Sequence, residues 1–374
     1  MVYKDFKDGI KLSRLGMGNM RLPKKPGGSD ADIDYEKGQE IIDYAMAHGI
    51  NYYDTAYVYH SGKSEEFVGT ALRKYPRDSY YIATKYNINA NPDYEDTFNT
   101  QLKRLGVDRI DFYLLHAIGD NTADKYLTNG CIEFFMQKKA EGKIKYLGFS
   151  EHCSPETLEK VASHHKWDFA QIQLNYFDWN YSSTKKEYEI LERHGIPIVV
   201  MESVRGGRLS SLTPDAEALL KNAHPDWSIS SWAFRWLKRL GQVQLCLSGM
   251  TTIDQMIDNV NTYSDDYALT DEEEALLFKA CDMFHEQVKV PCTACRYCTD
   301  GCPAKINIPE VLKVYNAYKL DGPWALMGMR NIDSEGKPTD CIQCGACTVE
   351  CPQSISVPEI MQELAEKMRE MENR

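Results

Sequence analysis

Eight of the twelve cysteines in this 374-residue chain fall into two copies of one pattern near the C-terminus. In each copy the spacing is C-x2-C-x2-C-x3-C, followed by a proline. The copies comprise Cys292, Cys295, Cys298 and Cys302, then Cys341, Cys344, Cys347 and Cys351. Three thiolates separated by two residues each can surround one face of a cubane iron–sulfur cluster. The pattern therefore predicts two 4Fe–4S clusters and a protein that transfers electrons.

The repeated run resembles the cluster-binding run of bacterial-type ferredoxins. In that run the fourth cysteine, which precedes the proline, ligates the other cluster. The resemblance implies that one cluster is held by Cys292, Cys295, Cys298 and Cys351, and the other by Cys341, Cys344, Cys347 and Cys302. A pair of structural zinc sites is the alternative, which we disfavour because zinc modules rarely place four cysteines in this compact spacing before a proline.

The overall charge of the chain limits its partners. The formal net charge is −12, so no basic field attracts nucleic acid or an anionic membrane surface. The first residues lack the apolar stretch of a signal peptide, and no run of about 18 apolar residues appears. We therefore predict a cytoplasmic protein with reduced thiols. The four cysteines outside the motifs are predicted to be small buried residues: Cys131, Cys153, Cys246 and Cys281.

Residues 10 to about 250 alternate short apolar runs with longer amphipathic stretches. The runs predict eight strands: Ser13–Gly18, Asn51–Asp54, Tyr80–Lys85, Ile110–His116, Tyr146–Ser150, Phe169–Leu174, Ile196–Ser203 and Gln242–Ser248. Eight strands alternating with helices over this length are typical of an α/β fold of the (β/α)8 TIM-barrel type. A doubly wound sheet is the alternative, but no GxGxxG turn follows the first strand.

The domain organisation follows from these two patterns. We predict a barrel over residues 1–268, a connecting helix over 269–287, and a small α+β ferredoxin-like domain over 288–374 that ends in a helix. The connecting helix begins with Thr270-Asp271-Glu272-Glu273, a capping residue followed by acids in the first turn.

Polar side chains follow three consecutive predicted strands at the face where such barrels carry their chemistry. Asp54 ends the second strand, Lys85 the third and His116 the fourth, and Tyr57 and Tyr59 follow shortly after Asp54. One such polar residue at the end of one strand would be explained by a salt bridge on the rim of the barrel. The four types together predict a catalytic site.

These residue types suit the reduction of a carbonyl or the reverse oxidation of an alcohol. A carbonyl that receives hydride needs a proton, and tyrosine normally holds its proton too tightly at neutral pH. A nearby ammonium favours tyrosinate, and a carboxylate keeps that ammonium charged and in place. We predict Tyr59 as general acid, Lys85 and Asp54 as its supporting pair, and His116 as the group that orients the carbonyl. By spacing alone, Tyr57 remains a competing candidate for the acid.

The barrel segment resembles the aldo-keto reductase family over roughly residues 10 to 260. The matching motifs are Asn51-Tyr52-Tyr53-Asp54-Thr55-Ala56, Tyr59, Gly62-Lys63-Ser64-Glu65, Lys85, His116 and Gly148-Phe149-Ser150. The resemblance implies a (β/α)8 barrel, carbonyl reduction, a nicotinamide bound without a Rossmann domain, and Tyr59 in preference to Tyr57. The whole chain resembles a subgroup of these reductases that carries a C-terminal ferredoxin-like domain.

The resemblance also implies a set of cofactor-binding positions. These are Gly18, Asn19, Met20, Arg21, Ser150, Gln171, Glu202, Gly249, Thr251, Gln255 and Asn259. Arg205, Gly207 and Arg208 could hold a cofactor phosphate, because glycines free the backbone and guanidinium groups match phosphate. A flexible rim loop is the equally weighted alternative for these three.

The chain departs from the family pattern at three cofactor positions. Glu151 stands where the family has asparagine, and Glu202 where it stacks a tyrosine on the nicotinamide ring. Between Ser248 and Asn259 there is no Lys or Arg to pair with a 2′-phosphate. We therefore expect NADH rather than NADPH.

Three functional hypotheses remain from the sequence. In the first, which we favour, the barrel reduces a small carbonyl or oxidises an alcohol with a nicotinamide, and the clusters serve structure or a redox partner protein. In the second, a flavin in the barrel couples one-electron transfer through the clusters to a two-electron substrate. In the third, the barrel is not catalytic and the chain is an electron carrier or redox sensor.

Overall fold

The computed structural model describes residues 1–372 of the chain. Two compact units are present, which we describe separately. The first comprises Met1–Val204 and Asp226–Glu274, and the second comprises Arg205–Pro225 and the residues from Ala275 onwards. The chain thus divides near the predicted connecting helix, but the segment Arg205–Pro225 groups with the C-terminal residues rather than with the barrel.

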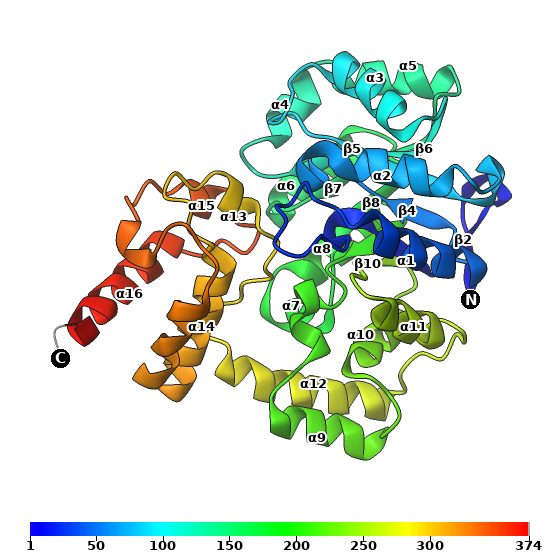
Figure 1. Cartoon of the computed structure of the whole chain (residues 1–374). Helices are drawn as coiled ribbons and strands as arrows, with labels where there is room; N and C mark the ends of the chain where they lie inside the picture. The colour runs from blue at the N-terminus through cyan, green and yellow to red at the C-terminus, as the bar shows by residue number, and fades with distance from the viewer. Residues whose placement is uncertain (373–374) are drawn as a thin grey trace. The chain divides into compact units, whose positions relative to one another are not determined.

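Within the described residues, eight parallel strands of the first unit close into a barrel (Figure 1). Each strand pairs with the next in sequence, and the last pairs back to the first. The strands are β3 (Leu15–Gly18), β4 (Tyr52–Asp54), β5 (Tyr81–Tyr86), β6 (Ile110–Ile118), β7 (Ile144–Glu151), β8 (Phe169–Gln173), β9 (Ile198–Met201) and β10 (Val243–Ser248). The prediction of a (β/α)8 barrel is confirmed, and closure of the sheet excludes the doubly wound alternative.

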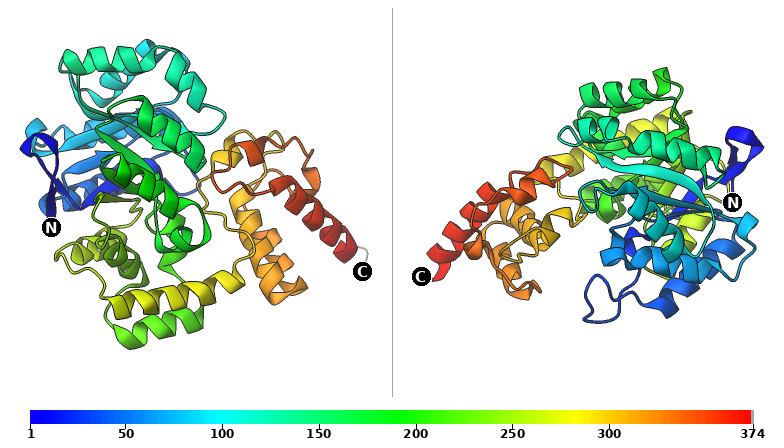
Figure 2. Two further views of the ribbon diagram at one scale, coloured as in Figure 1. Left: turned by 180° about the vertical axis from the view of Figure 1, so that it is seen from behind. Right: turned by 90° about the horizontal axis from the view of Figure 1, so that it is seen from above.

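Helices cover the outside of the barrel strands, as two further views also show (Figure 2). They are α1 (Tyr35–Ala47), α2 (Lys63–Leu72), α3 (Tyr94–Leu105), α4 (Ala123–Thr128), α5 (Cys131–Ala140), α6 (Pro155–His164), α7 (Tyr176–Tyr181), α8 (Thr184–Arg193), α10 (Ile229–Leu237) and α11 (Ile253–Thr262). Strands covered on both faces carry continuous apolar runs rather than alternating ones. In β6, for example, all residues except Ala117 are buried.

Three of these helices were not predicted from the sequence. Helices α4 and α7 have six residues each, too few to show a helical period. Helix α11 carried a signal that could have found it, because Thr252 and Gln255 form a capping box at its start.

One end of the barrel interior is filled with aromatic and aliphatic side chains. An antiparallel hairpin, β1 (Tyr3–Asp5) with β2 (Lys11–Ser13), precedes the barrel. Its Phe6 and Leu12 join a buried cluster with Tyr52, Phe112 and other inward-facing strand residues. Phe6 contacts the edge of the Tyr146 ring with centroids 5.0 Å apart. This cluster fills part of the barrel interior, and in barrels of this type the substrate binds at the carboxyl ends of the strands.

The second unit is mainly helical. It contains α9 (Pro214–Ala223), most of α12 (Asp271–Gln287), α13 (Tyr297–Asp300), α14 (Ile308–Asp321), α15 (Ala346–Val349) and α16 (Val357–Glu372). Among the described residues its β structure is an isolated bridge between Ile306 and Gly336. As predicted, α12 starts with a cap in which Thr270 Oγ1 accepts from Glu273 N at 3.2 Å.

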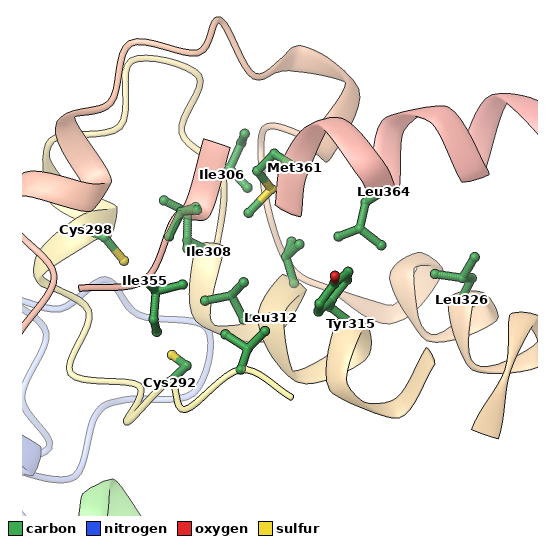
Figure 3. Packing of buried hydrophobic residues seen from close by; sticks show 13 residues of the cluster. Cys292, Cys298, Ile306, Ile308, Leu312, Tyr315, Leu326, Ile355, Met361 and Leu364 are labelled. Atoms are coloured by element: carbon green, nitrogen blue, oxygen red, sulfur yellow. The ribbon is translucent and has the colours of Figure 1, made fainter. Parts of the chain in front are cut away.

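The second unit has its own hydrophobic core (Figure 3). Leu312 and Tyr315 of α14 pack with Met361 and Leu364 of α16, and Cys292 and Cys298 border the same cluster. Over residues 1–372, no helix combines the length and apolarity that crossing a membrane requires.

Candidate functional site

The carboxyl ends of β4 and β5 bring a buried ion pair together. The Lys85 side chain is fully buried, and its Nζ donates to Asp54 Oδ1 at 2.6 Å and to the Thr55 carbonyl at 2.7 Å. A third, longer contact reaches Tyr59 Oη at 3.4 Å. The same Nζ lies 4.9 Å from the centre of the Tyr59 ring. Three of the residues predicted for catalysis are therefore in contact through one ammonium group.

Burial and pairing act in opposite directions on this ion pair. Burial lowers the pKa of Lys85 and raises the pKa of Asp54. The contact between them opposes both shifts. Asp54 Oδ2 is buried and has no hydrogen-bond partner among the described residues. Removing either partner would leave the other as an uncompensated buried charge, which is far more costly than the intact pair.

The structure distinguishes the two candidate tyrosines, which sequence spacing alone could not. Tyr59 opens a short 3-10 helix, η3 (Tyr59–Gly62), and its hydroxyl lies beside Lys85. The Tyr57 ring instead stacks under the Arg104 guanidinium, with its centroid 4.5 Å from Cζ. Arg104 also donates to the Tyr57 carbonyl at 3.2 Å. Only Tyr59 contacts the ammonium group among these two.

His116 completes the group at the end of β6. Its ring meets the Tyr59 ring edge-on, with centroids 5.8 Å apart and planes at 79°. Burial, the Lys85 charge and His152 hold the pKa of His116 well below its usual range. The imidazole is therefore neutral near pH 7, and its Nδ1 has no hydrogen-bond partner in the described part of the chain.

A break in strand pairing accompanies His116. The register between β6 and β7 shifts between Leu115 and Ile118, as in a β-bulge. Within it Ala117 has a φ of 51°, which is strained for a residue with a Cβ. The Ala117 N–H donates to Ser150 Oγ at 2.8 Å, which holds the bulge in place. The bulge thus fixes the backbone next to His116.

His60 is a positioning residue that the sequence analysis missed. It is buried and has a φ of 52°, directly after Tyr59. Its Nε2 accepts from Leu22 N at 3.3 Å, and its Nδ1 lies 2.8 Å from the Asp30 carbonyl. These two contacts tie the turn that carries Tyr59 to the loop after β3. No local motif distinguished this histidine from a solvated one.

A buried polar network supports the backbone of Lys85. Gln101 Nε2 donates to the Lys85 carbonyl at 3.0 Å and to Glu65 Oε1 at 2.8 Å. Thr84 Oγ1 donates to the same Glu65 oxygen at 2.6 Å. Glu65 belongs to the Gly62–Glu65 motif seen in the sequence, whereas Gln101 stands in an ordinary helical pattern. The network links α2 and α3 to the strand that positions Lys85.

The residues predicted to hold a nicotinamide carboxamide lie at the ends of β7 and β8. Gln171 Nε2 approaches Met201 Sδ at 3.6 Å, and its buried Oε1 lacks a partner within residues 1–372. Glu151, in the position of the family asparagine, instead accepts from Cys153 N at 2.9 Å. Burial and nearby Glu187 raise the pKa of Glu151 to about 8. Glu202 has a φ of 57°, and its carbonyl accepts from Asn175 Nδ2.

The loops after the first and last barrel strands lie against each other. A side chain at Gly249 would meet the aliphatic part of Arg21 at 3.1 Å, and one at Gly18 would meet the Ser248 carbonyl at 3.5 Å. Thr251 Oγ1 donates to the Arg21 carbonyl at 2.8 Å. Asn19, Met20 and Arg21 form the short helix η2 (Asn19–Arg21), which directly follows β3. The fold therefore places Arg21 beside the loop after β10, which contains no Lys or Arg of its own.

Two other predicted cofactor residues have structural partners. Gln255 Oε1 accepts from Thr251 N at 2.8 Å as part of the capping box of α11. Asn259 Nδ2 donates to Ser248 Oγ at 2.9 Å. Both side chains thus shape the loop after β10.

The second unit contains two cavities, each bordered by four cysteines. One cavity is lined by Cys292, Cys295, Cys298 and Cys351, among others. The second is lined by Cys302, Cys341, Cys344 and Cys347, among others. In each, the cysteine before proline comes from the other copy of the motif. Among the described residues, no His, Cys, Asp or Glu side chains gather tightly enough for a single metal ion; the cysteines stand around a void.

The predicted phosphate loop belongs to the second unit. Arg205 opens the 3-10 helix η5 (Arg205–Ser210), and Gly207 has a φ of 92°. The Arg205 guanidinium donates to Gln353 Oε1 at 2.7 Å. Gln353 lines the first cysteine cavity.

A comparison with protein families identifies the barrel. A model described as the aldo/keto reductase family matches residues 14–280. The chain belongs to the aldo/keto reductase family. A second model, described as a 4Fe-4S dicluster domain, matches residues 291–355. The chain therefore combines a barrel of the aldo/keto reductase family with a C-terminal 4Fe–4S domain.

Individual relatives resemble the barrel part. The chain is 32% identical over 202 residues to a probable aldo-keto reductase 1 of Glycine max, covering 51% of this chain and 56% of that protein. It is 28% identical over 179 residues to the aldo-keto reductase yakc [NADP(+)] of Schizosaccharomyces pombe, covering 44% and 49%. The matches thus span about half the length of these curated relatives. The solved holo form of aldo-keto reductase AKR11C1 from Bacillus halodurans is 27% identical with a TM-score of 0.63, covering 75% of this chain and 96% of that one.

His116 should remain uncharged across the neutral and mildly acidic range. Its pKa is lowered, so its ring should not titrate between about pH 5 and 8, as an exposed histidine near 6.5 would. The unfolded chain binds a proton near pH 6.5, so this histidine lowers the stability of the fold as pH falls below that value. Imidazole NMR signals followed against pH, with the His116 signal assigned from an H116Q spectrum, would test this. A His116 midpoint near 6.5 would contradict it.

Proposed function

We propose that this chain reduces a small carbonyl compound, or oxidises the corresponding alcohol, with Tyr59 as the proton donor. The observation that carries the proposal is the single buried ammonium of Lys85, shared between Asp54 Oδ1 at 2.6 Å and Tyr59 Oη at 3.4 Å. An ammonium held by a carboxylate beside a phenol is the arrangement that lets a tyrosine give up its proton near neutral pH. The substrate class follows from the family to which the chain belongs.

The proton transfer depends on these side chains alone. Tyr59 Oη donates its proton to the oxygen that becomes an alkoxide as the carbonyl is reduced. The Lys85 ammonium stabilises the tyrosinate that remains, and Asp54 holds the ammonium in position. In the oxidative direction the same tyrosinate accepts the proton from the alcohol.

Neutral His116 suits the role of orienting the substrate. An uncharged imidazole has one N–H donor and one acceptor nitrogen. Its position edge-on to Tyr59 supports a role in which its donor reaches the substrate oxygen that Tyr59 would protonate. A neutral donor polarises a carbonyl without adding a second positive charge next to Lys85, and the lowered pKa of His116 favours that state.

The carboxyl ends of β7 and β8 partly fit a nicotinamide. The unpartnered Gln171 Oε1 can accept from a carboxamide NH2 group, and the Ser150 hydroxyl, which accepts from Ala117 N, keeps its own proton to donate. At the family's asparagine position, Glu151 accepts a hydrogen bond from Cys153 N. A nicotinamide, when bound, supplies the hydride that reduces the carbonyl. The name of the Schizosaccharomyces pombe relative specifies NADP(+), which supports a nicotinamide here.

Replacing Tyr59 should abolish turnover, and replacing Tyr57 should not. Y59F removes the donated proton and should lower kcat by about 10²- to 10⁴-fold. Y57F removes a hydroxyl two residues away and keeps the ring that stacks on Arg104, so it is the matched control. Steady-state rates on a panel of aldehydes and ketones would measure both. Equal losses in the two variants, or wild-type rates in Y59F, would contradict the assignment.

The cofactor preference depends on the loop after β10. Because Ser248–Asn259 carries no Lys or Arg, we expect kcat/KM to be about tenfold higher with NADH than with NADPH. Arg21, which packs on Gly249, is the cation that could reverse this preference. Rates of both cofactors with wild type and R21Q would test it. A wild-type preference for NADPH that R21Q removes would overturn the expectation and assign the 2′-phosphate to Arg21.

We also propose that the C-terminal domain holds two 4Fe–4S clusters, one in each cysteine-lined cavity. Two observations support this: each cavity is bordered by four cysteines, and each combines cysteines of both motif copies. The apolar surroundings, with Ile355, Ile306 and Met361 near the cavities, suit buried clusters. The clusters, when bound, transfer single electrons, and a redox partner protein is the expected source or acceptor.

Metal analysis would test the clusters. After anaerobic reconstitution the wild type should contain roughly eight iron atoms per chain, and C344A should lose about four. C246A should keep the full content, because Cys246 is buried in β10, outside both motifs. Zinc instead of iron, or equal iron loss in both variants, would contradict the proposal.

A further inference from the structure

The two cysteine cavities differ in the charges around them. The residues that line the second cavity within the described chain are all uncharged. The first cavity is lined by Arg296 and by Gln353, which accepts a hydrogen bond from Arg205. The asymmetry matters because the net charge near an iron–sulfur cluster sets its reduction potential.

The backbone of η5 fixes Arg205 against the first cavity. Arg205, Gly206 and Gly207 all have positive φ, at 50°, 64° and 92°. This turn places Arg205 so that its side chain is buried and reaches Gln353, two residues after Cys351. An arginine ordered by burial and by a 2.7 Å hydrogen bond has a fixed charge near the cavity.

The positive charge of Arg205 lies one hydrogen-bonded side chain away from the first cavity, because Gln353, which lines that cavity, accepts from its guanidinium. A cation that stabilises a thiolate also stabilises any further negative charge placed at the same site. Reduction of a four-thiolate 4Fe–4S cluster adds one such charge.

We propose that Arg205 raises the reduction potential of the cluster held by Cys292, Cys295, Cys298 and Cys351 above that of the other cluster. This inference rests on the two clusters proposed above. An electron placed on the second cluster then passes to the first, so that the second is oxidised and the first is reduced. The Arg205 loop thereby sets the direction of electron flow within the domain, a role different from the cofactor-phosphate contact predicted from the sequence.

The test is a redox titration of the full, anaerobically reconstituted chain, followed by EPR. The variant C295A removes one ligand of the first set and identifies the signal of that cluster. In wild type this signal should have the higher midpoint potential. R205Q should lower it and change the one-electron equilibrium constant by about tenfold, equivalent to about 59 mV.

Two further variants separate charge from structure. R205K keeps the positive charge and should keep most of the potential. K313Q removes one positive charge from an exposed position on α14, paired with Glu310, and should move neither midpoint. The signal of the second cluster should be unchanged in R205Q, R205K and K313Q.

The outcomes distinguish this inference from the proposed clusters. Iron near eight atoms per chain with two EPR signals establishes the clusters independently of their potentials. If both signals are present but R205Q leaves the first midpoint unchanged, or shifts it no more than K313Q, the role of Arg205 is wrong and the clusters stand. If iron is absent, the proposed clusters themselves fail.

Discussion

The buried contact between Lys85 and Asp54 constrains the rest of the catalytic face. A fully buried ammonium is unfavourable unless it is paired and hydrogen-bonded. Here the carboxylate of β4 and the Thr55 carbonyl supply two contacts, and Tyr59 supplies a third. Adjacent parallel strands must therefore hold their register to within a fraction of a residue. Closure of the barrel and the hydrogen bonds of Gln101 and Glu65 provide that rigidity.

Two residues that directly follow site residues have strained backbone conformations, which shows where the fold overrides the local backbone preference. Ala117 and His60 both have positive φ and follow His116 and Tyr59 directly. Ser150 holds the first and Leu22 the second through hydrogen bonds. Such conformations persist only where the surroundings determine them. The packed opposite end of the barrel, around Phe6 and Phe112, supplies the stability against which this strain is maintained.

The chemistry proposed for the two halves of the chain differs in the number of electrons transferred in one step. Iron–sulfur clusters transfer one electron at a time, whereas a hydride carries two. The proposed role of the cysteine cavities and the Arg205 loop in the second unit is single-electron transfer. The proposed role of the Tyr59 group in the first unit is proton transfer that accompanies hydride transfer. A carrier that accepts two electrons and releases them singly, such as a flavin, is the chemistry that would join them.

The sequence by itself determined the features that depend on local spacing. A short run of neighbouring residues is enough to define each of these features: the cysteine motifs, the eight strand patterns and the polar residues at the strand ends. The contact of Tyr59 rather than Tyr57 with Lys85, the tether by His60 and the position of Arg21 beside Gly249 are visible only in the tertiary structure. The same holds for Arg205, whose guanidinium donates to Gln353, far away in the sequence. These contacts join segments whose meeting depends on how the chain closes in space, and no local pattern encodes that.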